Sequence, residues 1–244
     1  MLIFKYQLIH ITSNALKYPL TDFKKVLILG IITILSSLII PGFLLLGYFF
    51  KTIKCSMENT SELPEFSQWT SMFVDGLKIF VVLFVYSFIP GILILVGMWS
   101  VLLPMLTVPG AGSLLNPSIS LELVGGMVLI GLVLLVVISF LIPVALANMV
   151  HHNKLSAAFR FKGITGKIKE IGWVDYLIWY VIMLIIIGAV YYVSSFLIFP
   201  LFVGIIIVPL IIFPYLTIFF ARSVALIYKF EANHEYYRHS KQIK

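Results

Sequence analysis

Charged residues are scarce in this 244-residue chain, and they are confined to a few short stretches. Only 11% of the residues are charged, whereas soluble domains carry roughly 25%. Residues 26–50 and 176–221 carry no charge at all, and residues 79–153 carry only Glu122. A soluble core cannot account for so large a deficit. The composition therefore predicts an integral membrane protein of the cell membrane.

Groups that could carry chemistry are also few. Cys55 is the only cysteine, which excludes an intrachain disulfide and a paired-cysteine metal motif. His151 and His152 are adjacent, but neighbours on a helix point about 100° apart, and no third ligand is near in sequence. The apolar runs hold no carboxylate pair, no Ser-His-Asp order and no glycine-rich phosphate loop. We therefore expect no catalytic residue, no metal and no cofactor.

The long apolar runs set the number of membrane crossings, because one crossing helix needs about 20 apolar residues. Residues 79–153 make two crossings, joined by the uncharged Pro-, Gly- and Ser-rich stretch 102–120, which we place outside the cytoplasm. Residues 176–221 make two more, turning near Ser194-Ser195 or Pro200.

Residues 26–50 fit either one crossing or two short ones. A hairpin turning at Pro41-Gly42 places all 17 basic residues on one face of the membrane, whereas a single crossing divides them. We therefore predict an all-α, polytopic membrane helical bundle of six spans in three hairpins, the first one short, with both termini cytoplasmic. Five spans with an external N-terminus is the alternative.

An internal repeat is visible along the chain. The segments VDGL (74–77) and VDYL (174–177) match at an offset of one hundred residues, and each follows a proline-bearing apolar helix. The repeat predicts that aspartates begin three hairpins, where they accept unpaired backbone N–H groups, and that prolines kink the returning helices. The aspartates are Asp22, Asp75 and Asp175, and the candidate kink positions are Pro41, Pro143 and Pro214. Such kinks open a central crevice or merely fit curved packing.

Two cytoplasmic elbows join the hairpins. In the first, 51–78, apolar residues recur at helical spacing after Pro64, which predicts a short amphipathic helix along the lipid headgroups. The second, 151–173, holds the densest basic run, and we expect Gly163 and Gly166 to break it into two interfacial helices. Its apolar residues should anchor in the bilayer. The predicted lipid-headgroup contacts are Lys154, Arg160, Lys162, Lys167 and Lys169.

The ends of the chain differ from its middle. Residues 1–20 predict an interfacial amphipathic helix, 21–230 a single membrane domain, and 231–244 a polar tail. Arg222 lies about 10 Å deeper than Lys229 by helical rise. Three interpretations of Arg222 stay open: its side chain snorkels to the interface, it forms a buried ion pair with Asp75 or Asp175, or it holds an anionic ligand.

Several of these stretches resemble a known family. They look like domain of unknown function 4013, a largely archaeal family of prokaryotic membrane proteins, and they are 15–30, 44–54, 63–78, 155–164 and 171–181. The proline-bearing returning helices resemble, more weakly, the membrane domain of glycerophosphodiester phosphodiesterases. The first resemblance implies no catalytic residues. The second implies a related helical fold, without the soluble barrel that carries the hydrolase activity.

Three functions remain open. A non-catalytic membrane scaffold or accessory subunit accounts best for the elbows and for the scarcity of reactive groups. A small-molecule or lipid transporter is the alternative, because it would use repeats and proline kinks. An intramembrane lipid-modifying enzyme is third. The expected partners are membrane lipids, and either a membrane protein or a second copy of the chain. Nucleic acid is not expected, because the basic residues flank apolar runs and form no folded basic domain.

Overall fold

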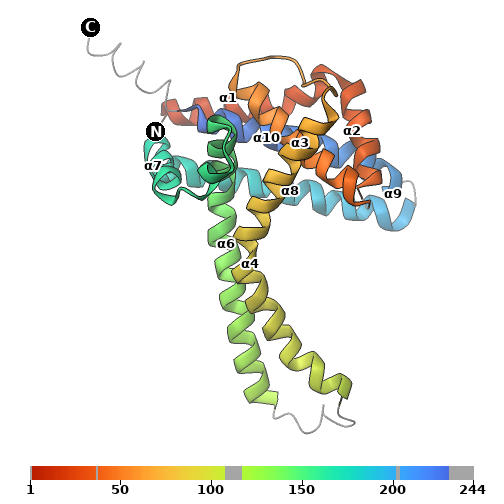
Figure 1. Cartoon of the computed structure of the whole chain (residues 1–244), viewed down its shortest axis with the longest axis vertical. Helices are drawn as coiled ribbons and strands as arrows, with labels where there is room; N and C mark the ends of the chain where they lie inside the picture. The colour runs from red at the N-terminus through yellow and green to blue at the C-terminus, as the bar shows by residue number, and fades with distance from the viewer. Residues whose placement is uncertain (1, 37, 108–116, 202–203, 231–244) are drawn as a thin grey trace. The chain divides into compact units, whose positions relative to one another are not determined.

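The computed structural model describes residues 2–36, 38–107, 117–201 and 204–230, and every regular element in these ranges is a helix (Figure 1). The all-α class predicted from the sequence is thereby confirmed. The elements are α1 (Leu2–Lys17), η1 (Tyr18–Thr21), α2 (Phe23–Leu35), α3 (Ile39–Met57), α4 (Trp69–Thr107), α6 (Pro117–His152), η2 (Leu155–Phe159), α7 (Phe161–Ile171), α8 (Trp173–Leu201), α9 (Gly204–Ile207), η3 (Val208–Ile212) and α10 (Phe213–Tyr228).

Five helical stretches of the described chain are long and apolar enough to cross a membrane. They are Ile39–Met57, Trp69–Ser100, Gly125–His152, Trp173–Leu197 and Gly204–Tyr228. Helix α2 has 13 residues, so it extends about 20 Å against a hydrocarbon thickness of about 30 Å. Whether α2 also penetrates the bilayer, as the six-span arrangement requires, stays a prediction.

The chain divides into two compact units. One consists of Met1–Phe80 and Val144–Lys244, and the other of Val81–Pro143. Helices α4 and α6 contribute to both. The outer parts of the predicted loop 102–120 are helical, its residues 108–116 lie outside the described ranges, and so does the predicted polar tail 231–244.

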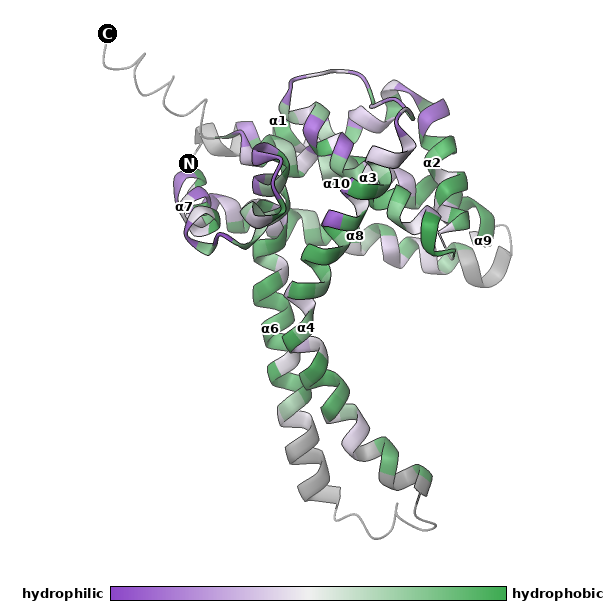
Figure 2. Cartoon of the chain, in the orientation of Figure 1, coloured by the Kyte–Doolittle hydropathy of each residue, from purple (hydrophilic) through white to green (hydrophobic). Residues whose placement is uncertain are grey.

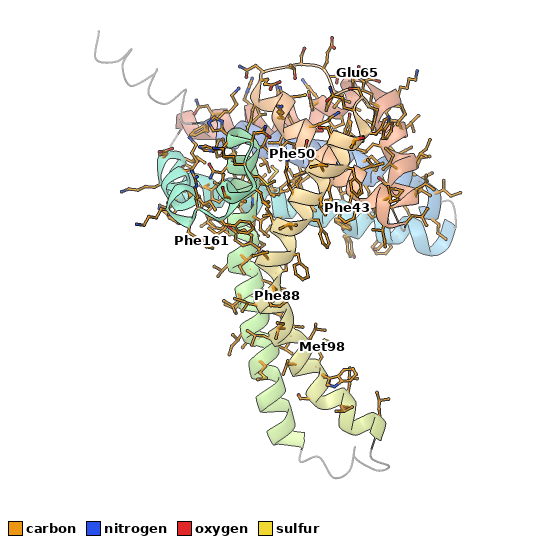
Figure 3. All side chains as sticks on the ribbon, in the orientation of Figure 1. Phe43, Phe50, Glu65, Phe88, Met98 and Phe161 are labelled. Atoms are coloured by element: carbon orange, nitrogen blue, oxygen red, sulfur yellow. The ribbon has the colours of Figure 1, made fainter. Side chains whose placement is uncertain are left out.

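The unit Val81–Pro143 is an antiparallel pair of helices that pack at glycines. A Cβ atom on Gly97 would meet Val128, and one on Gly131 would meet Ile94 and the carbonyl oxygen of Pro90. Small residues at these positions let the two backbones approach closely, as in membrane helix pairs. Large apolar side chains cover the outward faces, among them Phe88 and Met98 (Figures 2 and 3).

In the larger unit, α10 packs against α1, α2 and α3, and helices α1, α3 and α10 lie side by side (Figure 1). The buried face of α1 carries Leu8, Ile11 and Ala15, at the i, i+3, i+7 spacing of a single helix face. A core cluster joins the N-terminal helices to the start of α4 and to α10, and consists of Tyr18, Val26, Leu29, Tyr48, Leu63, Met72 and Ile218.

Three close helix contacts in this unit require glycine. A Cβ atom on Gly30 would lie 1.9 Å from the carbonyl oxygen of Leu210, and one on Gly47 would lie 1.8 Å from that of Met72. A Cβ atom on Gly76 would lie 1.8 Å from the carbonyl oxygen of Phe43. Helices α3 and α4 therefore touch backbone to backbone, with one glycine contributed by each.

The aspartates take different positions in their helices. Asp22 is the N-cap of α2, where its carboxylate accepts a hydrogen bond from the Lys25 backbone N–H, and Asp175 lies in the first turn of α8. Both positions agree with the prediction, and at Asp22 the predicted hydrogen bond is formed. Asp75 does not, because α4 begins at Trp69, and its carboxylate forms an ion pair with Lys78 at 2.7 Å instead.

The prolines also differ from one another. The predicted turn at Pro41-Gly42 is wrong: α2 ends at Leu35 and α3 begins at Ile39, so Pro41 lies in the first turn of α3 and interrupts no helix. A proline there loses no helical hydrogen bond, because the N–H groups of a first turn are unpaired. Pro143 lies inside α6, and Pro214 lies near the start of α10, directly after the π-helical turn η3.

Of the two positions predicted for the turn after residue 176, the structure agrees with the second: α8 runs through Ser194-Ser195 and ends at Leu201, beside Pro200. Two further local predictions need correction. Helix α7 runs through Gly163 and Gly166, and the elbow instead breaks at Arg160, between η2 and α7. No separate amphipathic helix follows Pro64 in the described chain, because the first helical turn there belongs to α4 itself.

The two VDxL segments have the same burial pattern. In each, the valine and the leucine are exposed and the residue between aspartate and leucine, Gly76 or Tyr176, is buried. Ile79 and Trp179, three residues further on, are buried in both copies. The matching pattern is consistent with a repeat of 100 residues, which stays a prediction.

Candidate functional site

A basic pocket lies where three apolar helical stretches end. Its volume is about 670 Å³, and its wall includes Met57, His152 and Tyr228, the last residues of three candidate membrane spans. The lining residues all belong to the larger unit and are Met57, Asn148, His151, His152, Lys162, Gly163, Gly166, Lys167, Glu170, Tyr228 and Lys229.

Helix α7 forms one wall because its residues separate onto two faces. Ile164, Ile168 and Ile171 are 0%, 0% and 2% exposed, and α7 packs against α8 and α10. The predicted anchoring of these isoleucines in the bilayer is therefore wrong, since protein covers them. A second face presents Gly163, Gly166, Lys167 and Glu170 to the pocket, at the i, i+3, i+4, i+7 spacing of one helix face.

A buried asparagine joins the end of α6, where it lies, to η2 and to α10. Asn148 is 5% exposed, and its Nδ2 donates to the carbonyl oxygen of Ala157 at 2.8 Å. Its Oδ1 accepts from the Tyr228 hydroxyl at 2.9 Å. His152 Nδ1 lies 3.0 Å from the backbone oxygen of Asn148. The amide therefore fixes the positions of η2, α6 and α10 around the pocket.

The cations of the pocket come from two distant parts of the chain. Lys167 Nζ lies 3.2 Å from Glu170 Oε2 and 5.2 Å from the centre of the Tyr228 ring. Lys229 Nζ donates to the backbone oxygen of Met57 at 2.5 Å and to Asn59 Oδ1 at 2.6 Å. Burial, and next the charge of Arg222, lower the pKa of Lys229. The Lys162 ammonium has no protein partner within the described chain.

The pocket contains only part of the predicted headgroup surface. Lys162 and Lys167 line it, whereas Lys154, Arg160 and Lys169 do not. Sequence reasoning missed Lys229, Asn148 and Tyr228, which lie at the ends of α6 and α10. The signal in the sequence that could have indicated them is that two apolar runs end at polar or basic residues.

Arg222 forms a second polar centre, buried in α10. It is 8% exposed; its Nε donates to Asn14 Oδ1 at 3.1 Å and its Nη1 to the backbone oxygen of Thr60 at 3.1 Å. The guanidinium carbon lies 4.4 Å from the centre of the Tyr18 ring. The alternative of an ion pair with Asp75 or Asp175 is not realised among the described residues, and neutral groups hold the arginine instead.

The loop between α3 and α4, residues 58–68, is held by hydrogen bonds to its own backbone oxygens. Five side chains from outside the loop each donate to one of its carbonyl groups. They are Arg222 to Thr60, Tyr18 to Glu62 (2.7 Å), Lys25 to Leu63 (2.8 Å), Tyr48 to Pro64 (3.2 Å) and Lys51 to Ser67. Desolvation in this region raises the pKa of Tyr18, an effect that the Arg222 charge partly offsets.

The adjacent histidines do not form a metal site with other residues of the described chain. Within the described ranges, no group of three or more His, Cys, Asp or Glu side chains could hold a metal ion. His151 and His152 contact each other edge to face, with ring centres 5.0 Å apart. Both rings border the pocket, where they add polar nitrogen atoms to its wall.

The fold and the pocket together define a class: an all-helical protein whose apolar helices are compatible with a membrane and end at a basic pocket. Residues 29–199 match the family described as "Protein of unknown function (DUF4013)". The match covers more than half of the chain, which therefore belongs to this family. The comparison with curated proteins found no match, and neither did the comparison with solved structures.

Proposed function

We propose that the chain is a non-catalytic scaffold or accessory subunit of the cell membrane, crossing it several times. The observation that carries this proposal is the use of the polar side chains in the apolar helices. Trp179 Nε1 donates to Ser223 Oγ at 2.8 Å, and Arg222 is held by Asn14 and Thr60. These groups stabilise the protein's own helices, which leaves them poorly placed for chemistry.

Four serine and threonine hydroxyl groups of the spans support the same proposal. Each donates to a carbonyl oxygen three or four residues earlier in its own helix, and the pairs are Thr52 to Tyr48, Ser139 to Val136, Ser194 to Val190 and Thr217 to Phe213. A hydroxyl bonded in this way has its hydrogen-bond acceptor within its own helix. The outward faces of Val81–Pro143 are apolar, which suits contact with lipid tails or with a partner's membrane helices.

A purification experiment tests the scaffold proposal. The full chain, tagged and extracted in mild detergent, should co-purify with a membrane protein at constant stoichiometry. Deletion of the gene should lower the abundance of that partner while lipid composition stays unchanged. A chain that purifies alone, together with altered lipids in the deletion strain, would contradict the proposal and favour the lipid-modifying enzyme.

A transporter is the second candidate, and the helical stretch Gly204–Tyr228 favours it. The π-helical turn Val208–Ile212 interrupts regular α-helix inside this candidate span, with Pro209 in the turn and Pro214 just after it. Interrupted helices inside a membrane are a common feature of transporter sites. Uptake or efflux of a solute by the purified chain in vesicles would support this candidate over the scaffold.

Topology provides a separate prediction. After replacement of Cys55, single cysteines at positions 5 and 160 should both resist a membrane-impermeant thiol reagent added from outside, because all 17 basic residues then share the cytoplasmic face. Both should react after the membrane is permeabilised. Labelling at position 5 but not at position 160 in intact cells would instead support five spans with an external N-terminus.

A further inference from the structure

We propose that the basic pocket at the ends of α3, α6 and α10 binds a phosphate monoester, carried either by a lipid headgroup or by a small soluble molecule. The site is independent of the scaffold role, because its three cations are not among the side chains that the scaffold proposal rests on. Three features of the pocket carry the inference: its charge, its prepared geometry and its position.

The charge of the lining fits a dianion. Lys162, Lys167 and Lys229 contribute three ammonium groups and Glu170 one carboxylate, which gives a formal charge of +2 when the histidines are neutral. A phosphate monoester carries about −1.5 to −2 near neutral pH. A phosphodiester carries one negative charge and has fewer free oxygens to accept hydrogen bonds. The balance of charge therefore favours the monoester.

The donors are held in place before any ligand binds. Lys229 is fixed by Met57 and Asn59, and its ammonium group retains one of three donor hydrogens. Lys167 is fixed by Glu170 and by the Tyr228 ring. Lys162 also lines the pocket and has no protein partner within the described chain, so it is free to turn toward an anion. Fixed donors lose little conformational freedom on binding.

Two glycines keep the pocket open. A Cβ atom on Gly166 would meet nothing within 4 Å, and one on Gly163 would meet nothing closer than 3.7 Å. Each glycine costs about 1 kcal/mol of helix propensity relative to alanine, yet packing does not require either one. Their absent side chains leave room for a group of the size of phosphate beside Lys162 and Lys167.

The position of the pocket suits a headgroup. Met57, His152 and Tyr228 end three stretches that are apolar enough to cross a membrane. The ends of such stretches lie at the level of the lipid phosphates. A soluble phosphate ester could reach the same site from the aqueous side, so the chemistry is shared by the two sources.

Binding to the detergent-purified full chain tests the site. Calorimetry or native mass spectrometry would use three probes: dioctanoyl phosphatidic acid, dioctanoyl phosphatidylglycerol and glycerol 3-phosphate. We expect the phosphatidic acid or the glycerol phosphate to bind at least about tenfold more tightly than the phosphatidylglycerol, which is about 1.4 kcal/mol. Binding of the lipid alone identifies a membrane source, and binding of both monoesters identifies the phosphate group itself as sufficient.

Matched variants separate the pocket from the general basic surface. Gly166→Glu introduces a carboxylate into open space and should abolish monoester binding, whereas Gly166→Ala should leave it within about twofold. Lys162→Gln should weaken binding, and Lys169→Gln, which removes the same charge outside the pocket, should not. Equal losses for Lys162→Gln and Lys169→Gln, or equal affinity for monoester and diester, would overturn the proposal. Every variant should still co-purify with the protein partner. Loss of monoester binding therefore tests the pocket alone, and loss of co-purification tests the scaffold proposal alone.

Discussion

Replacing Gly76 by alanine should destabilise the protein by about 3 kcal/mol or more, the upper end of the range for overpacked cores. The new Cβ atom would lie 1.8 Å from the carbonyl oxygen of Phe43, whereas Cβ atoms essentially never approach closer than 3.0 Å. The obstacle is backbone, so no rotamer change relieves it. Helices α3 and α4 must move apart by more than 1 Å, and the contact at Gly47 separates with them. Unfolding of the detergent-solubilised chain by heat or denaturant would measure the loss.

Gly188→Ala is the matched control for this substitution. Gly188 also lies within a helix of the larger unit, but a Cβ atom there would meet nothing within 4 Å. The control should be neutral or should stabilise the protein by up to about 1 kcal/mol through helix propensity. Equal effects of the two substitutions would mean that the close approach of α3 and α4 contributes nothing to stability.

Removing the side chain of Arg222 should cost about 3–5 kcal/mol, because two hydrogen bonds to a charged donor are worth about 1.5–3 kcal/mol each. Arg222→Ala leaves Asn14 Oδ1 and the Thr60 carbonyl without their donor, and it removes the cation from the Tyr18 ring. Residues 58–68 should then exchange their amide hydrogens faster. Unfolding measurements together with hydrogen exchange would detect both effects.

Three further variants separate the charge of Arg222 from its hydrogen bonds. Arg222→Lys keeps the charge but loses the planar fork that reaches Asn14 and Thr60 together, so it should recover less than half of the loss. Asn14→Ala removes one of the two hydrogen bonds and should have a smaller effect than Arg222→Ala. Arg160→Ala removes an exposed arginine and should change stability by less than about 0.5 kcal/mol. Full recovery with lysine would show that charge alone matters at this position.

The sequence predicted the end of a helix correctly where a single capping residue determines it. Asp22 caps α2 because its carboxylate reaches a backbone N–H three residues ahead, a purely local contact. The expected break of the elbow at Gly163 and Gly166 was wrong for an energetic reason. Each glycine costs about 1 kcal/mol in a helix, whereas each fully buried isoleucine contributes about 1.5–3 kcal/mol. Ile164, Ile168 and Ile171 therefore outweigh the two glycines.

The polar centres could be predicted only in part, because they depend on contacts between distant residues. Lys162 and Lys167 were identified from the basic run that contains them. Lys229 reaches the same pocket from the end of α10, and its place after an apolar run does not show which distant residues it meets there. Arg222 was singled out by its depth, but its partners Asn14 and Thr60 lie 208 and 162 residues away in sequence. Only the packing of α1, α3 and α10 brings them together.

The way in which residues 58–68 are held has a consequence for how this protein can diverge. At Glu62, Pro64 and Ser67 the donors bind a backbone oxygen, which every amino acid carries. Mutations that change the side chains at these three positions leave those hydrogen-bond acceptors in place. The hydrogen bonds to the loop backbone are therefore specified elsewhere in the sequence, by the donors at Tyr18, Lys25, Tyr48, Lys51 and Arg222. Selection to keep these hydrogen bonds would act on those donors, and on Leu63 in the core, while the exposed side chains of the loop are free to vary.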